Sequence, residues 1–116
     1  MNNENIQQYQ LPFKYTNGMF YEFVLVCRDD RFFLTDKGKT YEQLDKIFEL
    51  EEPDVIKNLV AILKRFNVNK IDNEFLIEIV DWNEDTNIEE NAVLSEAIYR
   101  LFACVSFMEN MSIFYV

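Results

Sequence analysis

A strand that runs through a glycine turn directly into a helix is the feature that most constrains this fold. Residues 32–35 are apolar, a polar turn follows around Gly38, and a helical pattern then begins. Thr40 and Gln43 have capping-box spacing, in which each side chain bonds the other residue's backbone N–H group. Gly38 is one of only two glycines, which indicates a position that needs positive φ. This corner is expected to organise the fold through Thr35, Asp36, Gly38 and Thr40.

The chain before the corner has a β pattern. Residues 1–10 are polar, and we expect them to form a flexible N-terminal arm. Residues 11–16 alternate as in a strand, and residues 19–27 form a returning strand rich in aromatic and β-branched side chains. The Asn17-Gly18 pair between them predicts a type I′ turn with positive φ at both residues. With residues 32–35, these segments predict a three-stranded antiparallel meander.

The chain after the corner begins as helix. Residues 41–50 form a first short helix, and Pro53 begins a second that ends near Asn67. A second hairpin follows, with strands over residues 68–71 and 74–80. Thr86 and Glu89 repeat the capping-box spacing and predict the start of a long C-terminal helix.

These segments occur in the order β-β-β-α-α-β-β-α. Without alternating β and α units, that order predicts an α+β fold with an antiparallel sheet of about five strands. The 116 residues are 49% hydrophobic, which supports a single domain over residues 11–116. No apolar run approaches the roughly 20 residues that cross a bilayer. The polar N-terminus does not resemble a secretion signal, so we expect a cytoplasmic protein in which Cys27 and Cys104 are buried free thiols.

The charge of −10 is distributed unevenly. Residues 1–70 hold eleven acids and ten bases, whereas residues 71–116 hold ten acids and a single base. Such a chain is not expected to bind nucleic acid directly, because phosphate binding needs Lys and Arg. Its acidic block can be a solvated surface or a recognition face for a basic protein. The face would consist of Glu74, Glu78, Asp81, Trp82, Glu84, Asp85, Glu89 and Glu96, with the tryptophan as an aromatic anchor or a core residue.

Catalytic residue types are scarce. The chain has no histidine, which removes the usual general base and the commonest metal ligand, and it has no glycine-rich phosphate loop. We therefore expect no cofactor. A Mg²⁺-dependent nuclease built from Asp29, Asp30 and Asp36, with Lys37 or Lys39, is the enzymatic alternative. Acids in tight turns also have an ordinary structural role, and Asp36 can accept N–H groups from its own turn.

The end of the C-terminal helix is apolar on all sides. Phe107 falls on the stripe that is otherwise polar, and Met111 and Phe114 follow it. Such a helix end is either part of the core or covered by a partner. A homodimer through Phe107, Met111 and Phe114 is therefore a third hypothesis.

Three groups of residues resemble one family of short proteins of unknown function from Gram-positive bacteria and their phages. The family's recurrent feature is an L-T-D-x-G-x-T corner, which corresponds to residues 34–40 here. The segments 11–18 and 63–77 resemble it too, with Lys39 in place of a larger residue and Asn67 in place of glycine. The resemblance spans about residues 11–112 and implies a phage or mobile-element setting.

Together these observations favour a small acidic accessory protein that is not an enzyme. Our leading hypothesis is an anti-defence protein of the anti-CRISPR or anti-restriction type. It would bind the basic surface of a host nucleic-acid enzyme with carboxylates that imitate a phosphate backbone, as a DNA mimic does. The nuclease and the homo-oligomeric structural protein are the alternatives.

Overall fold

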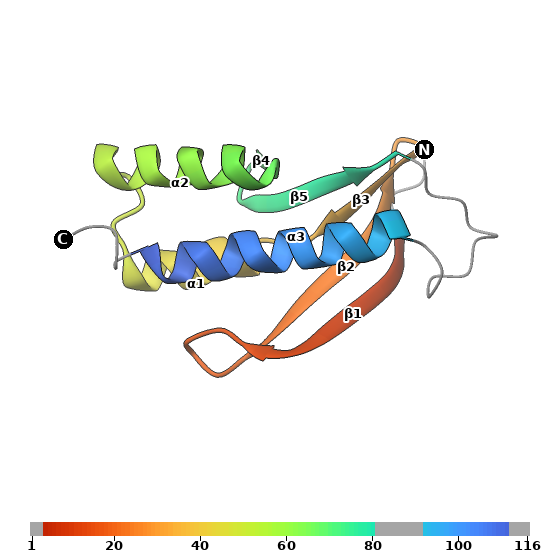
Figure 1. Ribbon diagram of the computed structural model, residues 1–116, viewed down its shortest axis with the longest axis horizontal. Coiled ribbons are helices and arrows are strands. Elements are labelled where there is room, and N and C mark those ends of the chain that lie inside the picture. The colour runs from red at the N-terminus through yellow and green to blue at the C-terminus, as the bar shows by residue number, and fades with distance from the viewer. Residues whose placement is uncertain (1–3, 81–91, 112–116) are drawn as a thin grey trace.

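The computed structural model describes residues 4–80 and 92–111 and has the α+β fold that the sequence predicts (Figure 1). All strand pairs are antiparallel, and the strand order in the five-stranded sheet is β1-β2-β3-β5-β4. The elements are β1 (Glu4–Lys14), β2 (Phe20–Arg28), β3 (Arg31–Thr35), α1 (Lys39–Ile47), α2 (Pro53–Phe66), β4 (Asn69–Ile71), β5 (Glu74–Ile79) and α3 (Ala92–Glu109).

The first strand begins well before the predicted position. The sequence predicts an arm over residues 1–10 and a strand from Leu11, but β1 begins at Glu4 and pairs with β2 along most of its length. Ile6 and Tyr9 are half-buried and pack against the core. The glutamines between and beside them are exposed, because β1 is an edge strand whose polar side chains remain in water. These polar residues made the segment look like a polar arm in the sequence.

The type I′ turn of the meander occurs at the second hairpin and not at the first, where it was predicted. Gly18 has φ +89°, but Asn17 does not have positive φ, so the predicted type I′ turn is not formed there. Instead the Asn17 Oδ1 atom accepts the Met19 N–H group at 2.9 Å, which is a typical side-chain turn of asparagine. The type I′ signature of two positive φ values occurs at Asp29 and Asp30, between β2 and β3 (53° and 64°).

The predicted capping box at Thr40 and Gln43 is also wrong. Helix α1 begins at Lys39, with Gly38 as its left-handed N-cap and no side-chain cap bond, so Thr40 already lies inside the helix. The side chains of Thr40 and Gln43 bond to residues outside α1 instead. The other helix signals are confirmed: Gly38 has φ +79°, Pro53 begins α2, and Asn67 ends it in the left-handed conformation.

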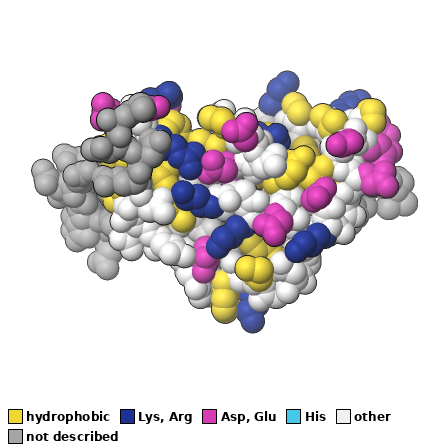
Figure 2. Space-filling model, turned by 180° about the vertical axis from the view of Figure 1, so that it is seen from behind, with side chains coloured by type: hydrophobic (Ala, Val, Ile, Leu, Met, Phe, Trp, Pro, Cys, Tyr) yellow, Lys and Arg dark blue, Asp and Glu magenta, His cyan; other side chains and the backbone are white. Residues whose placement is uncertain are grey.

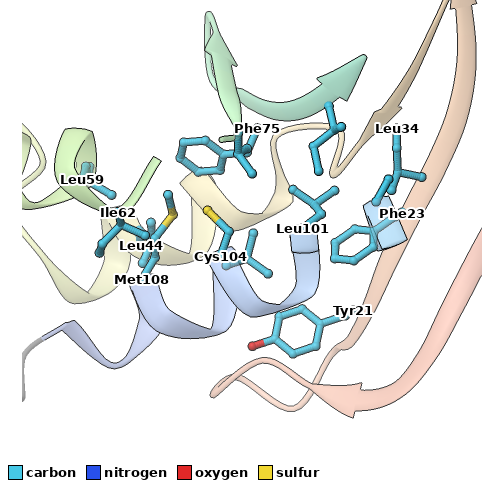
Figure 3. Close-up of a cluster of buried hydrophobic side chains, with 14 of the residues drawn as sticks. Tyr21, Phe23, Leu34, Leu44, Leu59, Ile62, Phe75, Leu101, Cys104 and Met108 are labelled. Carbon is cyan, nitrogen blue, oxygen red and sulfur yellow. The ribbon is translucent and has the colours of Figure 1, made fainter. Parts of the chain in front are cut away.

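The core lies between one face of the sheet and α3. Phe23, Leu34 and Phe75 on the strands and Leu101 and Met108 on the helix are all buried in it (Figure 3). Helix α3 crosses the sheet, and α2 packs beside it (Figure 1). Among residues 4–80 and 92–111, no helix has the length and apolar character to cross a membrane. Cys27 and Cys104 are free thiols, but only Cys104 is buried as predicted, and Cys27 is half-buried. Burial raises the pKa of Cys104 to about 12.

Candidate binding sites

The corner around Asp36 joins three elements. The Asp36 carboxylate accepts N–H groups from Gly38 (2.9 Å), from Thr40 (3.3 Å) and, across the sheet, from Phe75 (3.1 Å). The backbone N–H of Asp36 donates in turn to the Phe75 carbonyl at 3.2 Å. The side chain is fully buried, so it fixes the end of β3, the start of α1 and the first residues of β5 relative to one another.

The neighbours of Asp36 complete this corner. The Thr35 hydroxyl accepts the Lys37 N–H at 3.0 Å and donates to Glu74 at 2.7 Å. Lys37 and Gly38 both have positive φ, and a Cβ atom on Gly38 would lie 3.5 Å from the Asn73 carbonyl oxygen. Burial raises the pKa of Asp36, although its hydrogen bonds oppose the shift. These contacts give the corner the structural role expected of Thr35, Asp36, Gly38 and Thr40.

The acids of the nuclease alternative do not come together. Asp29 and Asp30 lie before β3 and Asp36 lies after it, so the five-residue strand separates them by roughly 17 Å. The Lys39 ammonium lies 2.7 Å from Glu22 Oε2. Within the part of the chain that the structure describes, no three Asp, Glu, Cys or His side chains form a group that could hold a metal ion.

The described carboxylates of the predicted acidic face are all in ion pairs. Arg28 donates to both oxygens of Glu74 (2.9 and 3.1 Å), and Arg31 donates to both oxygens of Glu78 (2.5 and 2.9 Å). Burial opposes ionisation of Glu74, but Arg28 and Thr35 outweigh it and lower its pKa. The hydrogen bonds from Arg31 lower the pKa of Glu78. Glu96 pairs with Arg100 at 2.9 Å on α3.

The Arg28–Glu74 and Arg31–Glu78 pairs lie on the face of the sheet opposite α3. By strand alternation this face also carries Val26, Phe33 and Leu76, and Val26 and Leu76 are each only 1% exposed. The Arg31 guanidinium lies 5.3 Å from the centre of the Phe33 ring. The molecule seen from behind shows acidic and basic side chains interspersed among hydrophobic ones (Figure 2). The described part of this face is therefore balanced in charge.

The other predicted members of the acidic face are Asp81, Trp82, Glu84, Asp85 and Glu89, which lie outside the described residues. In sequence, residues 81–91 contain five acids and no base. This segment therefore supplies half of the net charge of −10 from eleven residues. The carboxylates predicted to bind a partner thus divide into three that are ion-paired and four that lie outside the described residues.

The predicted oligomer contact falls on partly buried side chains. Met111 is only 1% exposed, so it offers little surface to a second copy. Phe107 is half-buried, with its ring 5.9 Å from Phe66 and 5.7 Å from the Arg65 guanidinium carbon. Both line a groove of about 570 Å³ between α2 and the end of α3. Phe114 lies outside the described residues.

A second apolar groove lies on the other side of α2. It has a volume of about 460 Å³ and is bordered by α1, α2 and β4. Ile56 and Val60 remain 46% and 42% exposed in its wall, while Glu51 and Lys70 supply its polar groups. Its size is in the range of ligand-binding pockets.

A buried polar network that sequence reasoning missed links the tip of the first hairpin to two helices. Glu109, at the end of α3, is 6% exposed and accepts the Tyr21 hydroxyl at 2.7 Å. It also accepts the N–H and the hydroxyl of Thr16 at 3.0 and 2.9 Å. Gln43 of α1 donates to the same Thr16 hydroxyl at 2.7 Å. The signal in the sequence was a lone Glu109 on an otherwise apolar helix end.

Comparison with known proteins gives one match. A family model described as "Domain of unknown function DUF1828" matches residues 11–99, which is more than half of the chain. A search of curated proteins finds no match, and a search of the solved structures finds none either. The match agrees with the resemblance to an uncharacterised family that the corner and its flanking segments show.

Proposed function

This chain belongs to the DUF1828 family of domains of unknown function, and we propose that it acts by binding another macromolecule rather than by catalysis. The observation that carries the proposal is the density of acids in residues 81–91, which hold five acids and no base. A basic partner surface would be attracted to such a segment, and charge complementarity would speed the encounter and select the partner.

The ion pairs of the sheet narrow the set of carboxylates that would contact the partner. Glu74 and Glu78 already hold two arginines, so offering them to a partner would require breaking bidentate pairs. Glu84, Asp85 and Glu89 lie in a segment that contains no base in its sequence. We therefore assign the main contact to residues 81–91, with Trp82 as its aromatic anchor.

The more specific form of the proposal concerns the partner. The chain would be a phage- or mobile-element-encoded inhibitor that occupies the phosphate-binding groove of a host nucleic-acid enzyme. A row of carboxylates presents the same sign of charge as a phosphate backbone and competes for the same Lys and Arg side chains. This form rests on the charge of the segment and on the resemblance to phage proteins.

The test compares two sets of amide substitutions that change the net charge equally. The first set is Asp81→Asn, Glu84→Gln, Asp85→Asn and Glu89→Gln. The control set removes four exposed acids near the α1–α2 connection, namely Asp45→Asn, Glu49→Gln, Glu51→Gln and Glu52→Gln. Affinity capture from a host lysate, followed by identification of the bound protein, should recover a nucleic-acid enzyme with wild type and control but not with the first set.

Salt provides an independent measurement of the same contact. Exposed charges are screened within about 10 Å at 0.1 M salt, so the captured protein should be released as salt rises. Equal capture by both variant sets, or capture that salt does not affect, would contradict the carboxylate mechanism. A nuclease assay with Mg²⁺ tests the enzymatic alternative separately, because cleavage lost in Asp29→Asn and Asp30→Asn would favour it.

A further inference from the structure

A small cavity beside the Glu109 network has the character of a ligand site. It has a volume of about 120 Å³ and lies between the tip of the first hairpin and α1. Gln43 and Tyr15 are its buried lining residues, at 6% and 4% exposed. At about 30 Å³ per water molecule, the volume equals that of about four waters. A compact molecule of a few heavy atoms fits it.

The hydrogen bonds fix which atom of Gln43 is left over. The Thr16 hydroxyl gives its single hydrogen to Glu109, so toward Gln43 it can only accept. The amide nitrogen of Gln43 must therefore face Thr16, at 2.7 Å. This turns the amide oxygen away from Thr16, and among the described residues that buried oxygen has no donor. A buried acceptor without a donor is costly, which indicates that something else supplies the donor.

Tyr15 adds a second acceptor. The Tyr15 hydroxyl lies 2.8 Å from the Thr40 hydroxyl, and either of the two can be the donor. In both cases the Tyr15 oxygen keeps a lone pair that can accept a hydrogen bond. The buried end of the cavity thus offers acceptors, and a ligand there must present N–H or O–H groups.

The exposed side of the cavity has the opposite requirement. Lys39 and Lys46, about two turns apart on α1, line it, and the charge of Lys39 is partly offset by Glu22 at 2.7 Å. Lys46 is exposed at the last turn of α1, so its ammonium group can meet an anion. Glu42 also lines the cavity and favours a cationic group. The lining therefore suits a ligand that carries both a cationic and an anionic group, with Lys46 available to the anionic one.

We propose that this cavity binds a small α-amino acid. Its ammonium group would donate to Gln43 Oε1 and to the Tyr15 oxygen, and its carboxylate would pair with Lys46. The side chain must be small, because the volume leaves room for little beyond the amino and carboxylate groups. This site lies apart from residues 81–91 in the sequence and does not depend on the partner proposed above.

The test is a titration of the ¹⁵N-labelled full-length chain followed by NMR. Glycine, L-alanine and L-serine should shift the side-chain amide signal of Gln43, with dissociation constants of about 1 mM or tighter. Propionate lacks the amine and leaves the buried oxygen unpaired, so it should bind at least about tenfold more weakly. L-lactate, with one hydroxyl donor in place of the ammonium, should bind between the two. Equal affinities for L-alanine and propionate, or no shift at about 10 mM ligand, would overturn the proposal.

Two lysine variants test whether L-alanine binds at this cavity. Lys46→Gln removes an exposed charge without touching the network and should weaken L-alanine binding about three- to tenfold. Lys57→Gln, an exposed lysine of α2 away from the cavity, is the matched control and should bind as wild type does. Equal weakening in both variants would mean that L-alanine responds to net charge and not to this cavity.

Discussion

The molecule uses carboxylates in two regions and in two different ways. Asp36, at the corner between β3 and α1, and Glu109, at the end of α3, are buried and accept hydrogen bonds from neutral donors. On the opposite face of the sheet, Glu74 and Glu78 are partly exposed and pair with arginines. The buried carboxylates hold segments that are distant in sequence, whereas the exposed ones lie over a sheet that strand pairing already fixes.

This difference predicts an unequal contribution to stability. A buried hydrogen-bond donor that loses its acceptor keeps the full cost of its desolvation, about 1–3 kcal/mol each. An exposed ion pair that loses one partner exchanges it for water, and such pairs contribute little. The number of charges in a region is thus a poor guide to how much that region stabilises the fold.

Replacing Asp36 should have the largest effect. Asp36→Ala leaves the N–H groups of Gly38, Thr40 and Phe75 without their acceptor in a fully buried site. We expect unfolding free energy to fall by about 4 kcal/mol, measured by urea denaturation. Asp36→Asn keeps one acceptor oxygen and should lose clearly less. Equal losses for the two variants would show that the negative charge, and not the accepted hydrogen bonds, is what matters.

Glu109 should rank second. Glu109→Leu removes the acceptor for the Tyr21 hydroxyl and for two donors of Thr16. Because Thr16 is exposed at the turn, water can replace part of this loss, and we expect about 2 kcal/mol by the same measurement. Hydrogen exchange should quicken at the tip of the hairpin in this variant and stay unchanged at β3. Unchanged exchange at the tip would mean that Glu109 does not hold the hairpin.

The fold could be predicted from the sequence because the signals that mark its turns and helix ends are local. The Asn67 cap, the Pro53 helix start and the positive φ of Gly38 depend on the residue itself and its neighbours, so they could be predicted. The capping box failed because Thr40 and Gln43 found partners 25 and 27 residues away. Spacing along a helix contains no information about such contacts.

The candidate sites were predicted less well for the same reason. Glu74 and Glu78 appear in sequence as free acids in a base-poor segment, because Arg28 and Arg31 lie 46 and 47 residues earlier. Only the strand order, which places β3 between β2 and β5, brings these charges together. The cavity at Gln43 requires knowing where the hairpin tip meets α1, and no local pattern encodes that meeting.

The two regions should also respond oppositely to pH. Burial raises the pKa of Asp36, so the unfolded chain loses this proton first and the Asp36 contribution falls as pH rises above about 4. Arg28 and Thr35 lower the pKa of Glu74, so its contribution is lost as pH falls below about 4. The stability difference between wild type and Asp36→Asn should therefore shrink as pH rises above about 4. The stability difference between wild type and Glu74→Gln should instead grow as pH rises toward about 4. Slopes of the same sign would contradict this assignment.

The Arg31–Glu78 pair should show the smallest effect. Although its geometry is bidentate, Arg31 lies at the end of its strand with its side chain 60% exposed, and the side chain also rests on the Phe33 ring. Glu78→Gln should leave the urea midpoint almost unchanged, because water solvates the freed guanidinium. Arg31→Ala should cost more than Glu78→Gln, since it also uncovers Phe33 and removes the cation–π contact. A double-mutant cycle separates the two contributions, and a coupling as large as the loss in Glu109→Leu would mean that the exposed face is held by its charges after all.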